Sequence, residues 1–200
     1  MTNEWNERFA GAGYFYGTAP AAFVRRWTAR LAPASRVLSV ADGEGRNAAH
    51  LARAGHRVTA FDGSQVALAK ARALAAGLST PPAFHLSHVE DWHWQPEAHD
   101  AVFGVFIQFA PPALRTAVFA GMAQTLRPGG RLLLHGFSTR QIGNRSGGPR
   151  DPVQLYTLDL LRAAFPGWQI EHEADYDADL DEGTGHHGPA ALVDFVALKP

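Results

Sequence analysis

Hydrophobic positions along this chain follow two different periods. Short apolar runs predict buried strands, and the segments between them carry apolar residues at helical spacing. The predicted strands cover residues 36–40, 57–61, 83–86, 101–107 and 131–137, and the predicted helices cover residues 21–31, 48–54, 66–76, 112–126 and 155–164. Strands that alternate with helices in this way are typical of βαβ units and a parallel sheet.

The end of the chain departs from that rhythm. Residues 168–174 and 190–198 read as two strands with no helix between them. Such a pair predicts an antiparallel hairpin at one edge of the sheet. The pattern therefore predicts an α/β fold in a single domain over residues 1–200, namely a Rossmann-like, doubly wound sheet of seven strands, mostly parallel with a C-terminal antiparallel strand.

Composition narrows the class of protein. Hydrophobic residues make up 46% of the chain, and 18 basic against 19 acidic residues give a net charge of −1. This balance is typical of a globular protein and provides no basic footprint for nucleic acid. The apolar run 101–107 is far shorter than the roughly 20 residues of a membrane span. With no cysteine for disulfides, we expect a cytoplasmic protein without nucleic-acid or membrane partners.

The first predicted strand ends in a glycine turn that a helix follows at once. The turn includes Ala41, Asp42, Gly43, Glu44 and Gly45. Glycines at such a turn let the backbone approach a ligand closely. Two carboxylates would repel a pyrophosphate, which seeks backbone N–H groups and positive potential. The turn therefore favours a sulfonium cofactor over NAD.

Three further positions follow the ends of later strands. Asp62 lies about 20 residues past Gly43, the spacing at which an acid accepts hydrogen bonds from a ribose diol, and Gly63 follows it. Asp62 also suits a helix N-cap. After the third strand, Val89 is a candidate to stack on adenine and Glu90 to bind its amino group; the alternative is a solvated loop anchored by tryptophans. Phe106, at the end of the fourth strand, is a candidate to line the pocket beside the transferred methyl group.

Four motifs in order resemble the class I S-adenosylmethionine-dependent methyltransferases. They are residues 37–47, Asp62, residues 126–131 (LRPGGR) before a hydrophobic strand, and residues 5–17. The segment GEGRN at residues 43–47 is similar to the tellurite-resistance and thiopurine methyltransferase-like branch. The resemblance implies S-adenosylmethionine as cofactor, a cap over the active site at residues 1–17, and the family's antiparallel seventh strand in the terminal hairpin.

The resemblance also implies the reaction. We expect methyl transfer to a small-molecule acceptor, with a soft sulfur, selenium or tellurium nucleophile among the candidates because it needs no strong base. The family usually carries an acid where Ser39 stands and a glycine where Ala41 stands. Those positions hold the amino-acid end of the cofactor, and Asp42 is the candidate to take over the ammonium contact.

Candidate catalytic residues come from segments on the cofactor side of the sheet. Arg145, in the predicted loop 138–155, is a candidate to orient an anionic substrate. His186 and His187, in the predicted loop 176–189, are candidates to accept a proton near neutral pH. Tyr16 is a candidate to close over the site. The alternative for the two histidines is a flexible loop with solvated imidazoles.

Two rival functions remain open. One is a non-catalytic domain that binds S-adenosylmethionine, which the departures at Ser39 and Ala41 favour. The other is an NAD-dependent oxidoreductase, although the turn lacks the G-x-G-x-x-G spacing. We expect no metal site, since His85 and His88 fall on opposite faces of a strand. We expect a monomer or a homodimer.

Overall fold

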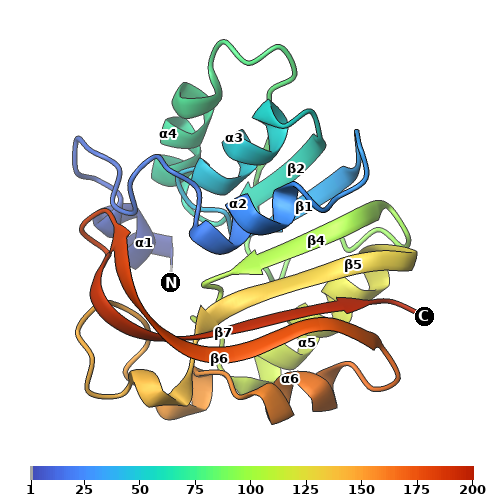
Figure 1. The fold of residues 1–200 in the computed structure, drawn as a ribbon. Coiled ribbons are helices and arrows are strands. Elements are labelled where there is room, and N and C mark those ends of the chain that lie inside the picture. The colour runs from blue at the N-terminus through green and yellow to red at the C-terminus, as the bar shows by residue number, and fades with distance from the viewer. Residues whose placement is uncertain (1) are drawn as a thin grey trace. The chain divides into compact units, whose positions relative to one another are not determined.

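The computed structural model describes residues 2–200 (Figure 1). Two compact units divide the chain: one runs up to Trp92 and includes Glu182–Gly185, and the other holds the remaining residues. The first unit contains α1 (Thr2–Arg8), α2 (Ala22–Thr28), β1 (Arg36–Val40), α3 (Arg46–Arg53), β2 (Arg57–Asp62), α4 (Gln65–Ala75) and β3 (Ala83–Leu86). The second contains β4 (His99–Val105), α5 (Pro112–Thr125), β5 (Leu126–Phe137), α6 (Leu158–Ala164), β7 (His186–Leu198) and most of β6 (Gln169–Glu182).

Parallel pairing organises the strands of the first unit. β1 pairs with β2, and β2 pairs with β3, both in parallel. Val37, Leu38 and Val40 of β1 are almost completely buried, as expected of a strand covered on both faces. Helix α4 begins at a side-chain cap, where Ser64 accepts a hydrogen bond from the Ala67 N–H. Ser64 therefore fills the N-cap position that also suited Asp62.

The direction of the strands in the second unit changes between β5 and β7. β4 and β5 are parallel, whereas β5 and β7 are antiparallel. The strand order of the 7-stranded sheet is β3-β2-β1-β4-β5-β7-β6. This topology confirms the predicted α/β fold class, with a mostly parallel sheet and an antiparallel C-terminal strand.

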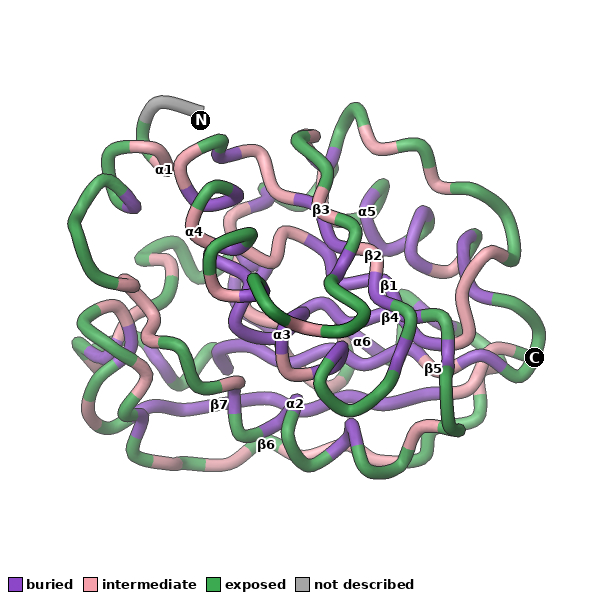
Figure 2. Tube along the Cα trace, turned by 90° about the horizontal axis from the view of Figure 1, so that it is seen from above, coloured by how far each residue is buried: buried purple, intermediate pink, exposed green. Residues whose placement is uncertain are grey.

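The terminal hairpin is longer than the sequence predicts. β6 has 14 residues and β7 has 13, so the predicted loop at residues 176–189 is wrong. His186 and His187 begin β7 instead of lying in that loop. Figure 2 shows the reason: β7 is mostly buried, whereas β6 is exposed along much of its length, and an exposed strand carries polar residues that conceal it in the sequence.

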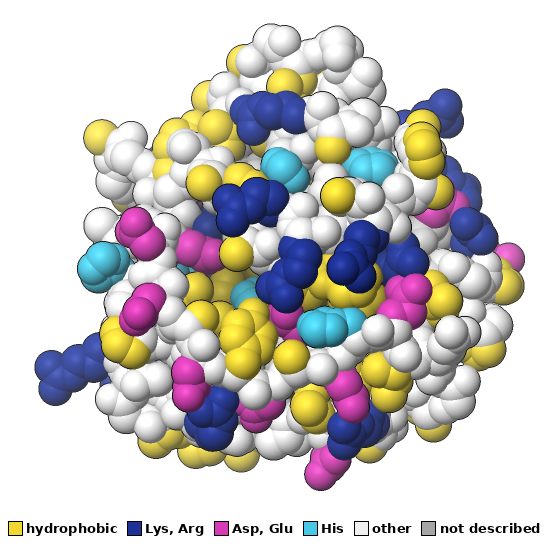
Figure 3. Space-filling view, viewed as in Figure 1, with side chains coloured by type: hydrophobic (Ala, Val, Ile, Leu, Met, Phe, Trp, Pro, Cys, Tyr) yellow, Lys and Arg dark blue, Asp and Glu magenta, His cyan; other side chains and the backbone are white. Residues whose placement is uncertain are grey.

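Acidic side chains occupy alternate positions of β6. These residues are Glu171, Glu173, Asp175, Asp177, Asp179 and Asp181. Figure 3 has the same view as Figure 1. It shows acidic side chains along the lower part of the face, where Figure 1 places β6 and β7. Arginines pair with several of them, for example Arg162 with Glu173 and Arg140 with Asp175. Charges at a sheet edge oppose pairing with another strand.

Gly45 is required by the packing of α3 against α4. A Cβ there would lie 2.6 Å from the Ala71 Cβ, and the Gly45 φ is +86°. We expect Gly45→Ala to lower the free energy of unfolding by about 3 kcal/mol, because overpacking and left-handed strain add. Gly77 has the same φ of +86° with open space around it, so Gly77→Ala should cost only about 1 kcal/mol. Urea unfolding of both variants measures the difference, and equal losses would show that the contact with Ala71 is unimportant.

Candidate functional site

The turn after β1 is built from left-handed backbone. Ala41, Gly43 and Gly45 have φ values of +47°, +61° and +86°. This conformation costs an alanine about 1 kcal/mol but is open to glycine. Helix α3 begins immediately afterwards at Arg46. The turn therefore lies at the carboxyl end of β1, where ligands bind in open α/β sheets.

Asp42 and Ser39 meet at this turn. The Ser39 Oγ–H donates to Asp42 Oδ1 at 2.5 Å, and the Ala48 N–H donates to Asp42 Oδ2 at 3.2 Å. Burial raises the pKa of the Asp42 carboxyl to about 7, and the nearby Asp62 carboxylate adds to that rise in pKa. The Asp42 carboxyl group is therefore hydrogen-bonded to Ser39, the position at which the family usually has an acid. The role of Asp42 toward the ammonium group of a cofactor stays a prediction.

Asp62 links the ends of β1 and β2. Its Oδ2 accepts from the Gly43 N–H at 2.9 Å, and its Oδ1 accepts from the Ser64 N–H at 2.8 Å. Burial raises the pKa of this carboxyl above its ordinary value. Each carboxylate oxygen has a second lone pair, so Asp62 can hold the turn and still accept hydrogen bonds from a ligand diol.

The segment after β3 contacts this site from the side. Gly63 is required for the approach of His88, since a Cβ on Gly63 would lie 2.6 Å from the His88 Nδ1. Val89 is buried, whereas Glu90 is exposed. The Trp92 ring stacks on Phe61 with 4.2 Å between ring centroids. Trp92 is therefore anchored on β2, and the adenine roles of Val89 and Glu90 stay predictions.

Glu44 belongs to the packing of the unit and not to a ligand site. Its Oε2 accepts from the Phe15 N–H at 2.6 Å, and its Oε1 accepts from the Lys70 Nζ at 2.8 Å. Its side chain is only 3% exposed. The sequence interpretation counted Glu44 among the acids facing a cofactor. These contacts instead join the N-terminal segment to the turn after β1 and to α4.

Removing the Glu44 charge should loosen the N-terminal segment. In Glu44→Gln the side-chain oxygen remains to accept from Phe15, but Lys70 loses its anion. We expect a loss of about 2 kcal/mol in unfolding free energy, because one partner of a mostly buried ion pair is removed. Hydrogen exchange at the Phe15 amide should also become faster. Glu90→Gln, which alters an exposed acid, is the control, and equal exchange in both variants would contradict the assignment.

The tip of the terminal hairpin closes over the same N-terminal segment. A Cβ on Gly183 would lie 2.5 Å from the Gly17 nitrogen, and the Gly185 N–H donates to the Phe15 oxygen at 3.0 Å. Arg46 donates to Glu182 at 2.7 Å and to the Tyr16 carbonyl at 3.1 Å. Burial raises the pKa of the Tyr16 phenol. The Tyr16 phenol therefore stays protonated at neutral pH.

An aromatic and imidazole cluster lies at the carboxyl ends of β4 and β5 in the second unit. Phe106 follows β4 directly and has a φ of +57°, an unusual conformation for a bulky residue. Its ring centroid is 4.3 Å from that of His186 and 4.7 Å from that of His135. His186 is buried at 4% exposure. Of the predicted catalytic residues, His186 is therefore part of a packed cluster, and the alternative of a solvated imidazole is wrong for it.

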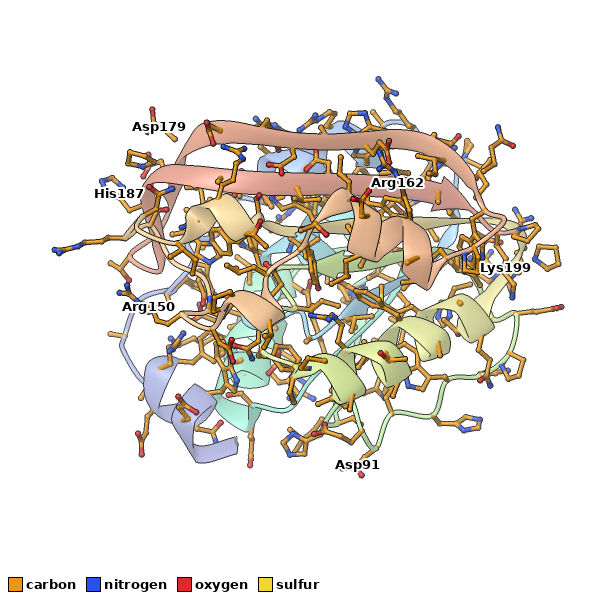
Figure 4. All side chains as sticks on the ribbon, turned by 90° about the horizontal axis from the view of Figure 1, so that it is seen from below. Asp91, Arg150, Arg162, Asp179, His187 and Lys199 are labelled. Atoms are coloured by element: carbon orange, nitrogen blue, oxygen red, sulfur yellow. The ribbon has the colours of Figure 1, made fainter. Side chains whose placement is uncertain are left out.

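The remaining candidate catalytic residues, His187 and Arg145, are exposed. The His187 side chain is 74% exposed and lies 3.6 Å from the Asp181 carboxylate. Figure 4 shows it at the outer end of the hairpin. Arg145 is exposed in the segment after β5. The predicted roles of these residues stay predictions, and their exposure gives them no fixed position for catalysis.

The sequence interpretation missed a buried polar network between β5 and β7. His135 Nδ1 lies 2.7 Å from Asp194 Oδ1, and the two residues are direct cross-strand partners. Tyr176 donates to the same oxygen at 3.2 Å. His135 and Asp194 are single polar residues within apolar runs, in the segments RLLLHGF and ALVDFVAL. In the sequence, a single polar residue that interrupts an apolar run is the signal of this buried network.

Two searches of the described residues complete the description. Over residues 2–200, histidine, aspartate and glutamate side chains form no group of three or more that could hold a metal ion. In the same range no helix is long and apolar enough to cross a membrane.

Comparisons with known proteins agree with this geometry. Residues 37–130 match the family described as a methyltransferase domain. Methyltransferase GfsG of Streptomyces halstedii is 28% identical over 181 residues, which are 82% of this chain and 62% of that protein. The chain thus spans less than two thirds of the length of that relative.

Two solved structures show the same fold. One was reported for the conversion of a disulfide bond into a thioacetal group during echinomycin biosynthesis. It has a TM-score of 0.77 and 21% identity, with 97% of this chain and 87% of that chain covered. The other is TehB from Haemophilus influenzae, with a TM-score of 0.75 and 18% identity, covering 98% of this chain and 67% of that chain.

Proposed function

We propose that this chain, which belongs to the class I methyltransferases by its domain and its fold, transfers a methyl group from S-adenosylmethionine to a small-molecule acceptor. The observation that carries the proposal is the Ser39–Asp42 contact of 2.5 Å. It supports a carboxylate at the carboxyl end of β1 despite the serine at position 39. A carboxylate there suits the ammonium group of the cofactor and opposes a pyrophosphate.

The binding roles follow from the chemistry of each residue. Asp42 would bind the ammonium group, and the Gly43 and Gly45 backbone would approach the amino-acid end next to Ala41. Asp62 and Gly63 would hold the ribose, and Val89 would pack on the adenine, with Glu90 at its edge. Phe106, which belongs to the second unit, is assigned to the cofactor by sequence alone. When bound, the sulfonium supplies an activated methyl group, and the protein must orient the acceptor in line and exclude water.

The N-terminal segment up to Gly17 is proposed as a cap. Its support is the set of contacts that Glu44 and the hairpin tip make with Phe15 and Tyr16. We further propose that the protein acts in the cytoplasm as a monomer or homodimer and without a nucleic-acid partner. The net charge of −1 supports the last point. Light scattering after gel filtration measures the oligomeric state.

Formation of S-adenosylhomocysteine tests the activity. The protein is incubated with S-adenosylmethionine and a panel of thiol, selenol, phenol and alcohol acceptors, and both products are followed by mass spectrometry. We expect acceptor-dependent S-adenosylhomocysteine with the wild type and none with Asp62→Ala. Cofactor binding without product on any acceptor would contradict methyl transfer and favour a non-catalytic binding domain.

A further inference from the structure

We infer that the Phe9 ring recognises the positive charge of the sulfonium group and is a specificity-determining residue of the cofactor site. This inference rests on the proposed function and adds to it, because Phe9 then favours the charged S-adenosylmethionine over the neutral product, S-adenosylhomocysteine. Every residue that carries the argument belongs to the first unit.

Phe9 lies directly against the glycine turn. It follows α1, and its N–H donates to the Trp5 oxygen at 3.0 Å, which continues the last turn of that helix. The residue is only 3% exposed. A Cβ on Gly43 would lie 3.5 Å from the Phe9 Cζ, which is an ordinary van der Waals distance. The ring therefore borders the backbone of Gly43.

The proposed anchors place the sulfonium group at the same glycine. Gly43 follows Asp42, the proposed ammonium partner, and its N–H donates to Asp62, the proposed ribose partner, at 2.9 Å. In S-adenosylmethionine the sulfur is bonded both to the amino-acid chain and to a carbon of the ribosyl group, so it lies between these two anchors. Gly43 and Asp62 are half-buried, so a ligand can reach them from solvent. The sulfonium therefore lies beside Gly43, next to the Phe9 ring.

The electrostatics of an aromatic ring suit this cation. The face of a phenyl ring carries negative potential, and a cation within about 6 Å of its centroid is attracted to it, as in the aromatic cages that bind quaternary ammonium ligands. A sulfonium resembles a quaternary ammonium because it has no N–H or O–H group to donate to water. Since Phe9 is buried, solvent weakens this attraction less than it would at an exposed ring.

Neighbouring rings already bind a cation of the chain. Phe9 stacks on Trp5 with 5.7 Å between ring centroids and packs edge to face on Phe15 at 6.5 Å. The Arg8 guanidinium lies over both neighbours, 4.7 Å from the Trp5 centroid and 5.8 Å from the Phe15 centroid. The aromatic cluster thus stabilises positive charge, and Phe9 is its member beside Gly43.

Glu44, the second carboxylate of the turn, is engaged elsewhere. Its two carboxylate oxygens accept from the Phe15 N–H and from the Lys70 Nζ. Because Asp42 is assigned to the ammonium group, the negative potential beside the sulfonium comes from the Phe9 ring and not from a carboxylate of its own.

The attraction ends when the methyl group leaves. The methyl carbon forms its bond to the acceptor, and the electron pair of the broken carbon–sulfur bond stays on sulfur as a neutral thioether. Phe9 then makes only an apolar contact with the product. We therefore expect the aromatic face of Phe9 to raise the affinity for S-adenosylmethionine and to leave that for S-adenosylhomocysteine nearly unchanged.

Isothermal titration calorimetry with the two ligands tests this inference. Phe9→Leu retains an apolar side chain but removes the aromatic face. We expect the substitution to weaken binding of S-adenosylmethionine by about tenfold, which is within the range of a desolvated cation–π contact. Binding of S-adenosylhomocysteine should change by less than about twofold, because the neutral thioether has no charge for the ring to attract.

Fluorinated rings separate charge recognition from packing. Monofluorophenylalanine and pentafluorophenylalanine at position 9 keep the shape of the ring and progressively remove the negative potential of its face. The affinity for S-adenosylmethionine should fall at each step, while that for S-adenosylhomocysteine stays constant. Phe23→Leu makes the matched change in the core of α2, where Phe23 is 1% exposed. It should leave the ratio of the two affinities unchanged.

Each outcome decides the inference. Equal losses for both ligands, or no loss for either, would overturn it while the proposed methyl transfer would stand. A loss in Phe9→Leu that the fluorinated variants do not share would also overturn it, because Phe9 would then only fill space. If circular dichroism shows that Phe9→Leu is unfolded, the fluorinated variants decide alone. Failure of the wild type to bind either ligand would contradict the proposed function, and this inference with it.

Discussion

Asp62→Ala is expected to weaken S-adenosylmethionine binding by at least roughly 100-fold, because hydrogen bonds to a charged acceptor are worth about 1.5–3 kcal/mol each. The substitution removes both the proposed ribose acceptors and the carboxylate that holds the Gly43 and Ser64 amides. Isothermal titration calorimetry measures the affinity. Asp62→Asn keeps one acceptor oxygen and should lose less affinity than Asp62→Ala.

The control for this prediction is Asp91→Ala, which removes an exposed carboxyl. Circular dichroism confirms that the Asp62 variants are folded before titration. If Asp62→Ala binds as tightly as the wild type, Asp62 has no ribose role. If Asp62→Ala binds poorly only because the turn is lost, Asp62→Asn will bind as poorly as Asp62→Ala.

Asp42 should make the stability of the free protein fall as the pH rises. Burial raises the pKa of its carboxyl from the ordinary value of 3.8 to about 7 in the folded protein. At a pH between these two pKa values, Asp42 is protonated in the folded protein and ionised in the unfolded chain. The free energy of unfolding is therefore highest below pH 3.8 and decreases as the pH rises to about 7. We expect a decline of about 4 kcal/mol relative to Asp42→Asn, whose side chain does not titrate. Urea unfolding at several pH values measures both proteins.

Cofactor affinity should change in the opposite sense. An ammonium group prefers the ionised form of Asp42, so the affinity should increase by up to roughly tenfold for each unit by which the pH rises toward the pKa of about 7. The gain should end above that pKa, and Asp42→Asn should bind weakly with no such slope. Calorimetry between mildly acidic and neutral pH tests it. A wild-type affinity that is independent of pH would contradict the ammonium contact.

The parallel strands were predictable because they are short apolar runs with polar ends. The segments 36–40 and 83–86 have the predicted bounds, and helix α6 begins three residues later than predicted, at Leu158. Strand β1 is buried along most of its length, so local sequence carries most of the information about it.

The hairpin was only partly predictable. β6 forms an edge whose alternate positions are acidic, and Pro189 lies within β7. Acids and proline are depleted in strands, so both signals favoured a loop. Pairing within the sheet overrides these local preferences.

The candidate site was predictable where function depends on spacing. Asp62 and the glycine turn follow strand ends, and the structure brings Gly43 and Asp62 together. The partners of individual side chains were not predictable. Glu44 binds Phe15 and Lys70, which are distant in sequence, and His135 meets Asp194 only because β5 and β7 are neighbours.

The most direct test is calorimetric titration of the wild-type protein with S-adenosylmethionine, S-adenosylhomocysteine and NAD. We expect both sulfur compounds to bind and NAD not to bind, because Asp42 places a carboxylate at the turn where a pyrophosphate would lie. Binding of NAD without binding of either sulfur compound would contradict the proposed cofactor site.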